Sequence, residues 1–429
     1  MVIYRTQLNN IKNLSKEQYG ILMEMCRYAN NLYNFALYQV RQHYFAQHGF
    51  LAYEDNYYLC KGNENYKLLQ AGCSQQILKL ADRSFKPFFN LKRKASKGEY
   101  RYHDVHMPGY REKGGMYVLV FSTNAITVKD GFFLVPMSRE FRKLHPGAEV
   151  KVPYPERLSG KPLKEVRIIP HHGKHFSIEY CYEDAIEPRE LDPSRVMGID
   201  VGVNNLAACV ANAGTPFLVD GRKLKSINQY YNRQLAHYRS VAMSQGARTT
   251  KRIRNLALKR DRQVTDCMRK AARLIVNRCL EGGIGTVVCG YSKGWKQESR
   301  FGRTRREQKR NNQNFVQIPH GTFRECLASL CEKYGIRYLE QEESYTSQAS
   351  FPDGDFIPTY VPGGSDGYTF SGKRIKRGLY RTGNGILVNA DCNGAANIVA
   401  KSKQESQLDI PLEGLSRGVL DTPVKVRIS

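Results

Sequence analysis

The spacing of apolar residues predicts a short strand followed by helices in the first quarter of the chain. Residues 2–8 alternate between apolar and polar side chains, as an edge strand does. From Ser15, a suitable helix cap, apolar positions keep a helical spacing to about Phe45, and a second helical stretch covers about 74–98. Tyrosine and phenylalanine alternate with lysine and arginine over 78–118, which suits either stacking on nucleic acid or the half-buried surface of a helical bundle.

From about residue 117 to 182 the apolar pattern changes to strict alternation, which is typical of half-buried strands. Asp130 and Gly131 lie between two alternating runs and give the strongest hairpin signal in the chain. We expect a small antiparallel barrel or sandwich, with the helices inserted after its first strand. The segment 183–195 is acidic, contains proline and has no pattern, so it predicts a domain boundary.

The rest of the chain has a different order of elements. Three strands in a meander are followed by a long helical region at about 222–282, a short buried strand GTVVCGY, a helix and the strand IRYLEQEES. An irregular segment rich in Gly, Asp and Tyr, 345–389, precedes a final helix. This order of strands and helices is that of an RNase H-like nuclease core.

Composition points to a polyanion as partner. The 429 residues carry 66 Lys and Arg against 40 Asp and Glu, a net charge of +26, and such an excess favours nucleic acid. The 41% of apolar residues excludes wholesale disorder, and no apolar run is long enough to span a membrane. The start of the chain lacks a signal-peptide layout, and the 11 cysteines form no CxxC pair, so we expect reduced, mostly buried thiols in a cytoplasmic protein.

Two basic stretches, 248–262 and 293–310, are either solvated faces or the lining of a phosphate channel. Their concentration of charge favours the channel. Trp295, the only tryptophan, either stacks on a base or anchors its loop. The residues predicted to bind nucleic acid are Arg252, Arg254, Lys259, Arg260, Lys293, Trp295, Lys296, Arg303, Arg305 and Arg306.

Two aspartates are candidates for metal chemistry. Asp200 ends the first strand of the RNase H-like region between glycines, and Asp391 lies where a strand-like segment runs into the last helix. Taken singly, Asp200 could cap a strand turn and Asp391 could cap the helix. Together, at the ends of elements in this order, they suit two-metal cleavage of a phosphodiester.

Four motifs make the resemblance specific. In this order, GIDVGVNNLA, NNQNFVQIP, YTSQ and NADCNGAANI resemble TnpB proteins over about 196–400. TnpB proteins are RNA-guided DNA endonucleases of insertion sequences and ancestors of compact type V CRISPR effectors. The resemblance implies that Asp200 and Asp391 are the first and third RuvC carboxylates and that the cofactor is two Mg²⁺ ions. It also implies a guide RNA and a double-stranded DNA target, cut next to a short adjacent motif.

The expected fold class is therefore α/β plus β. An RNase H-like (RuvC) nuclease domain lies C-terminal to a small β-barrel wedge domain, into which a helical recognition domain is inserted. The expected domains are a wedge-like barrel at 1–10 and 117–190, a helical recognition domain at 11–116, a nuclease domain at 191–402 with a degenerate zinc-ribbon-like insertion at 345–389, and a flexible tail at 403–429.

The chain departs from the family pattern at two places. The second RuvC carboxylate of the family is a glutamate at the end of the strand written here GTVVCGY, and Gly290 stands in its place. The family's zinc ribbon needs about four Cys or His ligands, and 345–390 contains neither residue, so we expect no zinc.

We predict that the missing carboxylate is supplied by the end of the next strand. Because side chains alternate along a strand, only one of Glu342 and Glu343 should point to the metals, and Glu343 is favoured. The predicted catalytic and metal-binding residues are thus Asp200, Glu343 and Asp391.

Two other functions stay open. Gly290 argues for an RNA-guided DNA-binding protein without nuclease activity, and an unguided junction-resolving nuclease would hold no RNA. An actin-like ATPase is excluded by the charge and by the absence of phosphate-binding glycine loops. The sequence does not give the oligomeric state, although a monomer is favoured.

Overall fold

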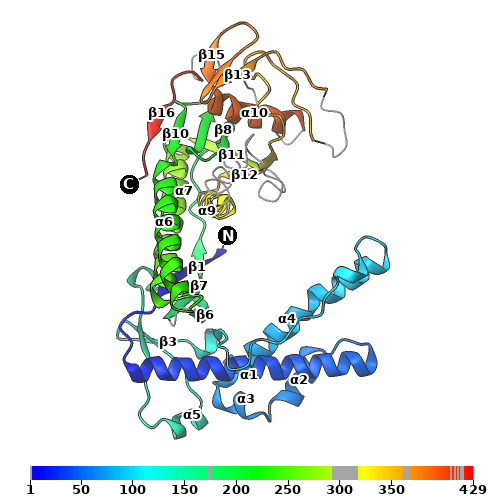
Figure 1. Cartoon of the computed structure of the whole chain (residues 1–429), viewed down its shortest axis with the longest axis vertical. Helices are drawn as coiled ribbons and strands as arrows, with labels where there is room; N and C mark the ends of the chain where they lie inside the picture. Colours follow the sequence, from blue (N-terminus) through cyan, green and yellow to red (C-terminus); the bar gives the residue numbers. More distant parts are fainter. Residues whose placement is uncertain are drawn as a thin grey trace. The chain divides into compact units, whose positions relative to one another are not determined.

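The computed structural model describes residues 2–171, 175–291, 317–360, 367–405, 408–409, 412, 415 and 420–428. The chain has a mixed α/β fold with several sheets and divides into two compact units, Met1–Ala185 and Ile186–Ser429 (Figure 1). No helix in the described part is both long and apolar enough to cross a bilayer.

Most helices of the first unit lie between its first and second strands in the chain, and one follows later. They are α1 (Lys16–Gln47), α2 (Tyr53–Cys60), α3 (Glu64–Leu68), α4 (Ala71–Ser96) and the later α5 (Arg139–Leu144). The predicted cap is confirmed: the Ser15 hydroxyl accepts from the N–H of Gln18, whose side chain in turn accepts from the N–H of Ser15. Helices α1 and α4 pack together and contribute Leu32 and Phe85 to the core of this unit.

The strands of the first unit form two antiparallel sheets. A four-stranded sheet has the order β1 (Val2–Asn10), β7 (His175–Ala185), β6 (Leu163–His171), β2 (Leu119–Ser122), and a three-stranded sheet has the order β3 (Thr127–Lys129), β4 (Phe132–Leu134), β5 (Lys151–Pro153). The predicted hairpin joins β3 to β4, with φ of 53° at Asp130 and 75° at Gly131. Both residues adopt the left-handed conformation that such a tight turn requires.

The predicted closed barrel is wrong among the described residues, because the two sheets are separate. A helical turn, Thr123–Ala125, interrupts the chain between β2 and β3, so the ladder does not continue from one sheet into the other. The sheets instead share a core in which the Phe133 ring lies 6.0 Å from that of Phe121 and 6.4 Å from that of Tyr180. The arrangement is therefore the sandwich that the alternating pattern left open.

A six-stranded sheet organises the second unit. Its order is β12 (Arg337–Glu342), β11 (Ile284–Tyr291), β8 (Asp192–Val201), β9 (Asn205–Ala211), β10 (Phe217–Asp220), β16 (Val424–Val426). Strands β8, β9 and β10 form the predicted antiparallel meander, while β11 and β12 run parallel to β8. The carboxyl ends of β8, β11 and β12 therefore meet at one edge of the sheet.

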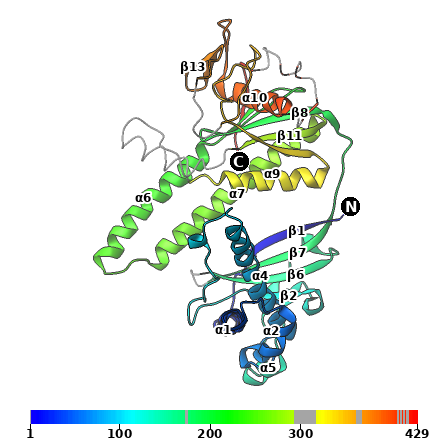
Figure 2. The ribbon, with the colours of Figure 1, turned by 90° about the vertical axis from the view of Figure 1, so that its right-hand side faces the viewer.

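Helices cover both faces of this sheet. Helix α10 (Ala390–Gln404) packs on one face, and α7 (Lys251–Glu281) and α9 (His320–Tyr334) pack on the other, while α6 (Arg222–Ser244) packs on α7 (Figure 2). Gly198 faces α10, and a Cβ there would overlap the carbonyl oxygen of Ala395, so glycine allows the helix to approach the strand closely. A small antiparallel sheet of β13 (Lys373–Lys376), β14 (Leu379–Arg381) and β15 (Leu387–Asn389) precedes α10.

The flexible tail expected at 403–429 is wrong for the described residues of that segment. Strand β16 pairs in parallel with β10, and Leu415, Leu420 and Ile428 are buried. Without β16, the N–H and C=O groups of β10 would form an unpaired edge of the sheet. Apolar burial and this strand pairing hold those described residues in place.

Candidate active site

Asp200 lies near the end of β8 on the face that α10 covers. A Cβ on Gly394 of α10 would be 2.8 Å from Asp200 Oδ2, so only a residue without a side chain leaves room for this carboxylate. Burial, together with the negative charge of Asp391, raises the pKa of Asp200 to about 7, although Arg374 acts in the opposite direction. Asp200 is thus an enclosed carboxylate with a second carboxylate close enough to affect its ionisation.

Asp391 lies in the first turn of α10 but does not cap the helix. The cap is Asn389, whose side-chain oxygen accepts from the N–H groups of Asp391 and Cys392 at 3.0 and 3.1 Å. The Asp391 carboxylate instead accepts from Asn205 Nδ2 at 2.7 Å and from Arg374 Nη2 at 3.1 Å. Helix capping therefore does not account for this aspartate.

Glu343 occupies the space beside Gly290. Gly290 pairs with Gln341 in the sheet, and a Cβ added to Gly290 would be 2.8 Å from Glu343 Oε2 and 2.6 Å from Ile398 Cδ1. Burial and the charges of Asp200 and Glu342 raise the pKa of Glu343 to about 8. The structure thus brings the Glu343 carboxylate into the region where a side chain at position 290 would start.

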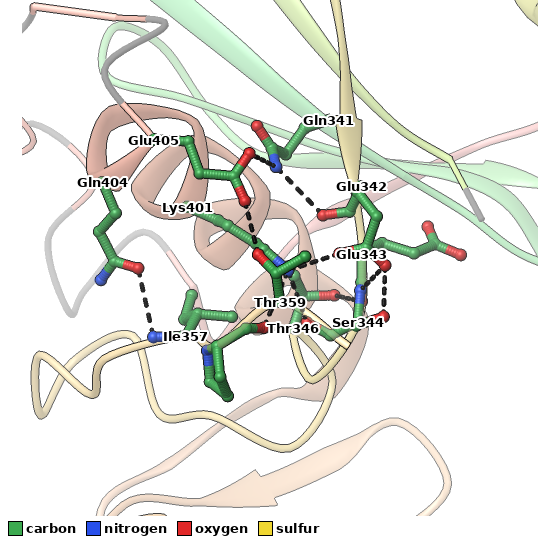
Figure 3. A network of polar contacts seen from close by, with 11 residues as sticks. Gln341, Glu342, Glu343, Ser344, Thr346, Ile357, Thr359, Lys401, Gln404 and Glu405 are labelled. Carbon is green, nitrogen blue, oxygen red and sulfur yellow. Dashed lines mark hydrogen bonds and ion pairs between the residues drawn. The ribbon is translucent and has the colours of Figure 1, made fainter. Parts of the chain in front are cut away.

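Glu342 faces a different partner from its neighbour. Its carboxylate accepts from Lys401 Nζ at 2.6 Å and from the N–H of Ser344 at 2.8 Å (Figure 3). Burial opposes ionisation, but these hydrogen bonds outweigh it and hold the pKa of Glu342 below its ordinary value. The two adjacent glutamates are therefore in distinct settings: Glu343 interacts with Asp200, and Glu342 is paired with a lysine.

Asp200, Glu343 and Asp391 fit magnesium by the chemistry of their donors, since carboxylate oxygens are the ligands that this ion prefers. Their arrangement is not yet a metal site: no group of three or more His, Cys, Asp or Glu side chains in the described ranges is placed so that it could hold an ion. The contacts of Asp391 are one reason why the three carboxylates do not form a ready metal site, because Asn205 and Arg374 engage both of its oxygens. Arg374 would have to release Asp391 before that carboxylate could contribute fully.

Two aspartates hold the segment 345–389 together, and we call Asp353, Asp355 and their hydrogen bonds the aspartate bridge. Asp353 accepts from the Ser350 hydroxyl at 2.5 Å and from the N–H of Gly383 at 2.6 Å. Asp355 accepts from the N–H groups of Ser350 at 2.7 Å and Ser371 at 3.1 Å. The bridge thus joins three parts of the segment that are distant in sequence.

The predicted nucleic-acid-binding residues differ in their surroundings. Arg252 and Lys259 are exposed, and the Arg252 guanidinium lies 4.4 Å from the centre of the Tyr238 ring. Arg254 is half-buried. Arg260 donates to Asn228, Asp261 and the carbonyl of Gln317, so it has a structural role within the unit. The remaining candidates lie outside the described residues: Lys293, Trp295, Lys296, Arg303, Arg305 and Arg306.

The sequence prediction missed three residues around the carboxylates. Asn205 belongs to the GIDVGVNN motif, which we used as a whole without asking what each polar residue contacts. Arg374 lies in the basic run KRIKR, which could have been noticed in an otherwise acidic and glycine-rich segment. Lys401 had no signal, because a lysine in the last turn of a helix normally faces solvent near the negative end of the helix dipole.

Comparison of the structure with solved proteins defines the class of fold. The chain is similar to the protein in a cryo-EM structure of a Cas12f1–sgRNA–target DNA complex, with a TM-score of 0.59 and 14% identity over 90% of this chain and 83% of that one. A weaker likeness, with a TM-score of 0.49 and 11% identity, is to the mini-RNA-guided endonuclease CRISPR-Cas_phi3, over 95% of this chain and 94% of that one. The first likeness shows that the chain shares the fold of the Cas12f1 protein in that complex.

Family models narrow this class. Residues 178–296 match the family OrfB_IS605, described as a probable transposase, and residues 320–398 match the Cas12f1-like TNB domain. None of the curated protein sequences compared with the chain matches it significantly. Together, the two family models and the structural likeness support the TnpB-like family that the motifs predict.

Proposed function

We propose that the chain is an RNA-guided DNA endonuclease that cuts its target next to a short adjacent motif by two-metal, RuvC-type hydrolysis. The second unit supports this by its strand order, in which a meander is followed by two parallel strands on the other side of β8. The observation that carries the proposal is the position of Glu343 Oε2, 2.8 Å from where a Cβ on Gly290 would lie. A carboxylate is available at the place where the family's second one is missing.

Asp200, Glu343 and Asp391 would hold two magnesium ions, which when bound supply an activated water and stabilise the leaving oxygen. The protein's own contribution is to place three carboxylates on one side of a sheet that is otherwise tightly packed. Gly394 leaves room for Asp200, and Gly290 leaves room for Glu343. Asn205 orients Asp391 by donating to Oδ2, which fixes the carboxylate as ligand-supporting hydrogen bonds do in metal sites.

Guide RNA and double-stranded DNA are the proposed partners. The net charge of +26 suits two polyanions, and the relative with the same fold is in complex with an sgRNA and a target DNA. In such an effector, base pairing with the guide would choose the sequence, while the protein reads backbone shape and the adjacent motif. Within this proposal the wedge-like part comprises 1–10 and 117–190 and the helical recognition part comprises 11–116, while residues 191–402 form the nuclease domain.

One observation favours the second candidate, an RNA-guided DNA-binding protein without nuclease activity. Both oxygens of Asp391 are engaged by Asn205 and Arg374, so this carboxylate is satisfied without a metal. Cleavage needs Arg374 to leave Asp391 when metal and DNA arrive. Binding alone needs no such change.

The test is a cleavage assay with the protein purified together with its RNA. We expect a discrete RNA to co-purify, and magnesium-dependent cutting to be lost in Asp200→Ala and Asp391→Ala while target binding persists. Target binding without any cutting in the wild type, across Mg²⁺ and Mn²⁺, would select the second candidate. Sequence-specific duplex binding by RNA-free protein would contradict both.

A further inference from the structure

The ion pair between the buried Lys401 and the half-buried Glu342 is separate from the three carboxylates Asp200, Glu343 and Asp391. Lys401 lies in the last turn of α10 and is 0% exposed. Its ammonium donates to Glu342 Oε2 at 2.6 Å, to the Pro358 carbonyl at 3.0 Å and to the Ser344 carbonyl at 3.2 Å. All three donors of the ammonium have acceptors, so this lysine holds together the end of β12 and the segment that follows it (Figure 3).

Lys401 engages the residues on both sides of Glu343. Its ammonium donates to the Glu342 carboxylate and to the Ser344 carbonyl, so Glu343 lies between two fixed points. The backbone of Glu343 is held as well: its N–H donates to the Tyr291 carbonyl at 3.1 Å, and its carbonyl accepts from the Thr346 hydroxyl at 2.9 Å. The backbone of Glu343 is therefore held on both sides, which sets the direction in which its side chain leaves the chain.

A second layer of contacts ties the same strand end to α10. Gln341 Nε2 donates to Glu405 Oε2 at 2.9 Å, and Glu405 Oε1 accepts from the Thr359 hydroxyl at 2.8 Å. Asn397 Nδ2 donates to the Thr346 carbonyl at 2.8 Å. Helix α10 thus carries Asp391 in its first turn and, through its later turns, holds the strand end that carries Glu343.

We propose that Lys401, acting through Glu342 and Ser344, is a positioning residue that aims the Glu343 carboxylate at the space over Gly290. The proposal rests on the proposed function, in which Glu343 is a metal-binding carboxylate. It gives a reason for two adjacent glutamates: the first anchors the strand end to α10, and the second reaches the site. Helix α10 then sets the separation of Asp391 and Glu343, because Asp391 is part of this helix and Lys401 of the same helix holds the residues on either side of Glu343.

A purely structural role for the ion pair makes a different prediction. Removing one partner of a buried pair is strongly destabilising, but replacing both by neutral groups of similar size is often neutral or stabilising. If Lys401 only stabilises the fold, the double variant Glu342→Gln/Lys401→Met should recover both stability and function. If Lys401 positions Glu343, the double variant should recover part of the stability, since no charge is left unpaired, but not function, because its Met cannot donate to the Ser344 and Pro358 carbonyls.

The experiment uses full-length protein loaded with its guide RNA and compares Lys401→Met, Lys401→Arg, Glu342→Gln and the double variant. Lys403→Met, an exposed lysine on the same helix, is the matched control. The readouts are the melting temperature, target binding, the Mg²⁺ concentration that half-saturates cleavage, and direct binding of Mn²⁺ measured by electron paramagnetic resonance. The last readout does not depend on turnover.

We expect Lys401→Met and the double variant to weaken Mn²⁺ binding and raise the half-saturating Mg²⁺ concentration by about 10-fold or more, with target binding and the Lys403→Met control unchanged. The metal affinity of Lys401→Arg should lie between those of the wild type and Lys401→Met. If Lys401→Met does not fold, Lys401→Arg provides the test in its place. Recovery of wild-type metal binding in the double variant would overturn the proposal. Glu343→Gln separates a failure of the proposed metal site from a failure of the positioning role. If Glu343→Gln cuts DNA like the wild type, the proposed site is wrong. If Glu343→Gln is inactive while every folded Lys401 variant binds metal normally, only the positioning role is wrong.

Discussion

The end of β11 and the segment 345–389 each lack a group that the TnpB resemblance leads one to expect, and the structure fills the two places differently. At the end of β11 the missing glutamate leaves Gly290, and the carboxylate of Glu343 lies in the space beside it. In 345–389 no Cys or His is present, and the aspartate bridge joins Ser350, Ser371 and Gly383 through hydrogen bonds. One place receives the same chemical group from a neighbouring strand, and the other receives different chemistry.

Under the proposed function, the difference follows from what each place would have to do. A two-metal site needs negative oxygen ligands, because the ions repel each other and neutral groups offset too little of that repulsion. Only another carboxylate can substitute. A structural cross-link only has to hold segments together, and carboxylates that accept backbone N–H groups do this at about 1.5–3 kcal/mol for each charged hydrogen bond. Function thus constrains the first place more tightly than the second.

The largest effect should come from removing the relocated carboxylate. Glu343→Gln keeps the shape of the side chain but loses the charge, so we expect cleavage to fall by about 100-fold or more while guide and target binding stay within a factor of two. Glu342→Gln, which keeps the Glu343 carboxylate itself, is the matched neighbour and should retain more activity. Single-turnover cleavage of the guided target measures both. Full activity in Glu343→Gln would contradict the idea that this carboxylate takes the place of the missing glutamate.

A swap tests the same point in the opposite direction. In Gly290→Glu/Glu343→Gln the carboxylate returns to the end of β11, and the flexible end of Ile398 is one of the groups that must move. We expect the double variant to cut faster than Glu343→Gln alone. No gain over Glu343→Gln would mean that the two positions do not serve one site.

The second effect is on stability. Asp353→Asn and Asp355→Asn keep the size of the side chain but weaken hydrogen bonds that the structure uses to join three parts of 345–389. Each should lower the free energy of unfolding by about 1–3 kcal/mol. Asp266→Asn, which removes an exposed pair with Lys270 on α7, is the control and should cost much less. Thermal unfolding followed by calorimetry is the measurement, and a zinc chelator should not change the wild-type value.

The third effect is a pH dependence that only the carboxylate site should show. Unfolded Asp and Glu titrate near pH 4, whereas in the folded, metal-free protein the pKa of Asp200 is about 7 and that of Glu343 about 8. The folded state therefore holds protons that the unfolded state has lost, so this site makes the metal-free protein less stable as pH rises from about 4 to 8. Magnesium competes with those protons, and its stabilising effect should grow over the upper part of that range.

Melting temperatures with and without Mg²⁺, measured from about pH 6 to 9, test this dependence. Glu343→Gln should reduce the growth of the magnesium effect, and Asp353→Asn should leave it unchanged because Asp353 does not contribute to the raised pKa of Asp200 or of Glu343. An equal magnesium effect at both ends of the range would contradict the assignment of these two carboxyls to the site.

The sequence predicted most of the second unit because its pattern and its motifs agree. Alternation and helical spacing located the meander, β11, β12 and α10, and the family motifs marked Asp200 and Asp391. The separation of the two sheets in the first unit and the strand β16 were not predictable in this way. Short strands such as Val424–Val426 carry too little pattern, and pairing between distant segments leaves no local signal.

The surroundings of the carboxylates were harder to predict for a related reason. Alternation along β12 left Glu342 and Glu343 as alternatives, since it says that they differ in direction but not which one meets Asp200. The deciding contact, between Glu342 and Lys401, joins residues 59 positions apart. Hydrogen bonds of this kind depend on how a helix packs on a sheet. This packing is a property of the tertiary structure and leaves no signal in the sequence around either residue.

The smallest expected effect concerns the space itself. Gly290→Ala adds one methyl group that would lie 2.6 Å from Ile398 Cδ1 and 2.8 Å from Glu343 Oε2, so one of the two must move. If Glu343 moves, cleavage should fall by about 3- to 10-fold and the half-saturating Mg²⁺ concentration should rise, since a displaced ligand weakens metal binding. If Ile398 moves, activity should stay near wild type. Gly290→Ala/Ile398→Val, which removes the Cδ1 atom, separates the cases: a loss that persists in this double variant comes from Glu343, and a loss that disappears comes from packing. A persistent loss would mean that the Glu343 carboxylate needs a glycine beside it at the end of β11.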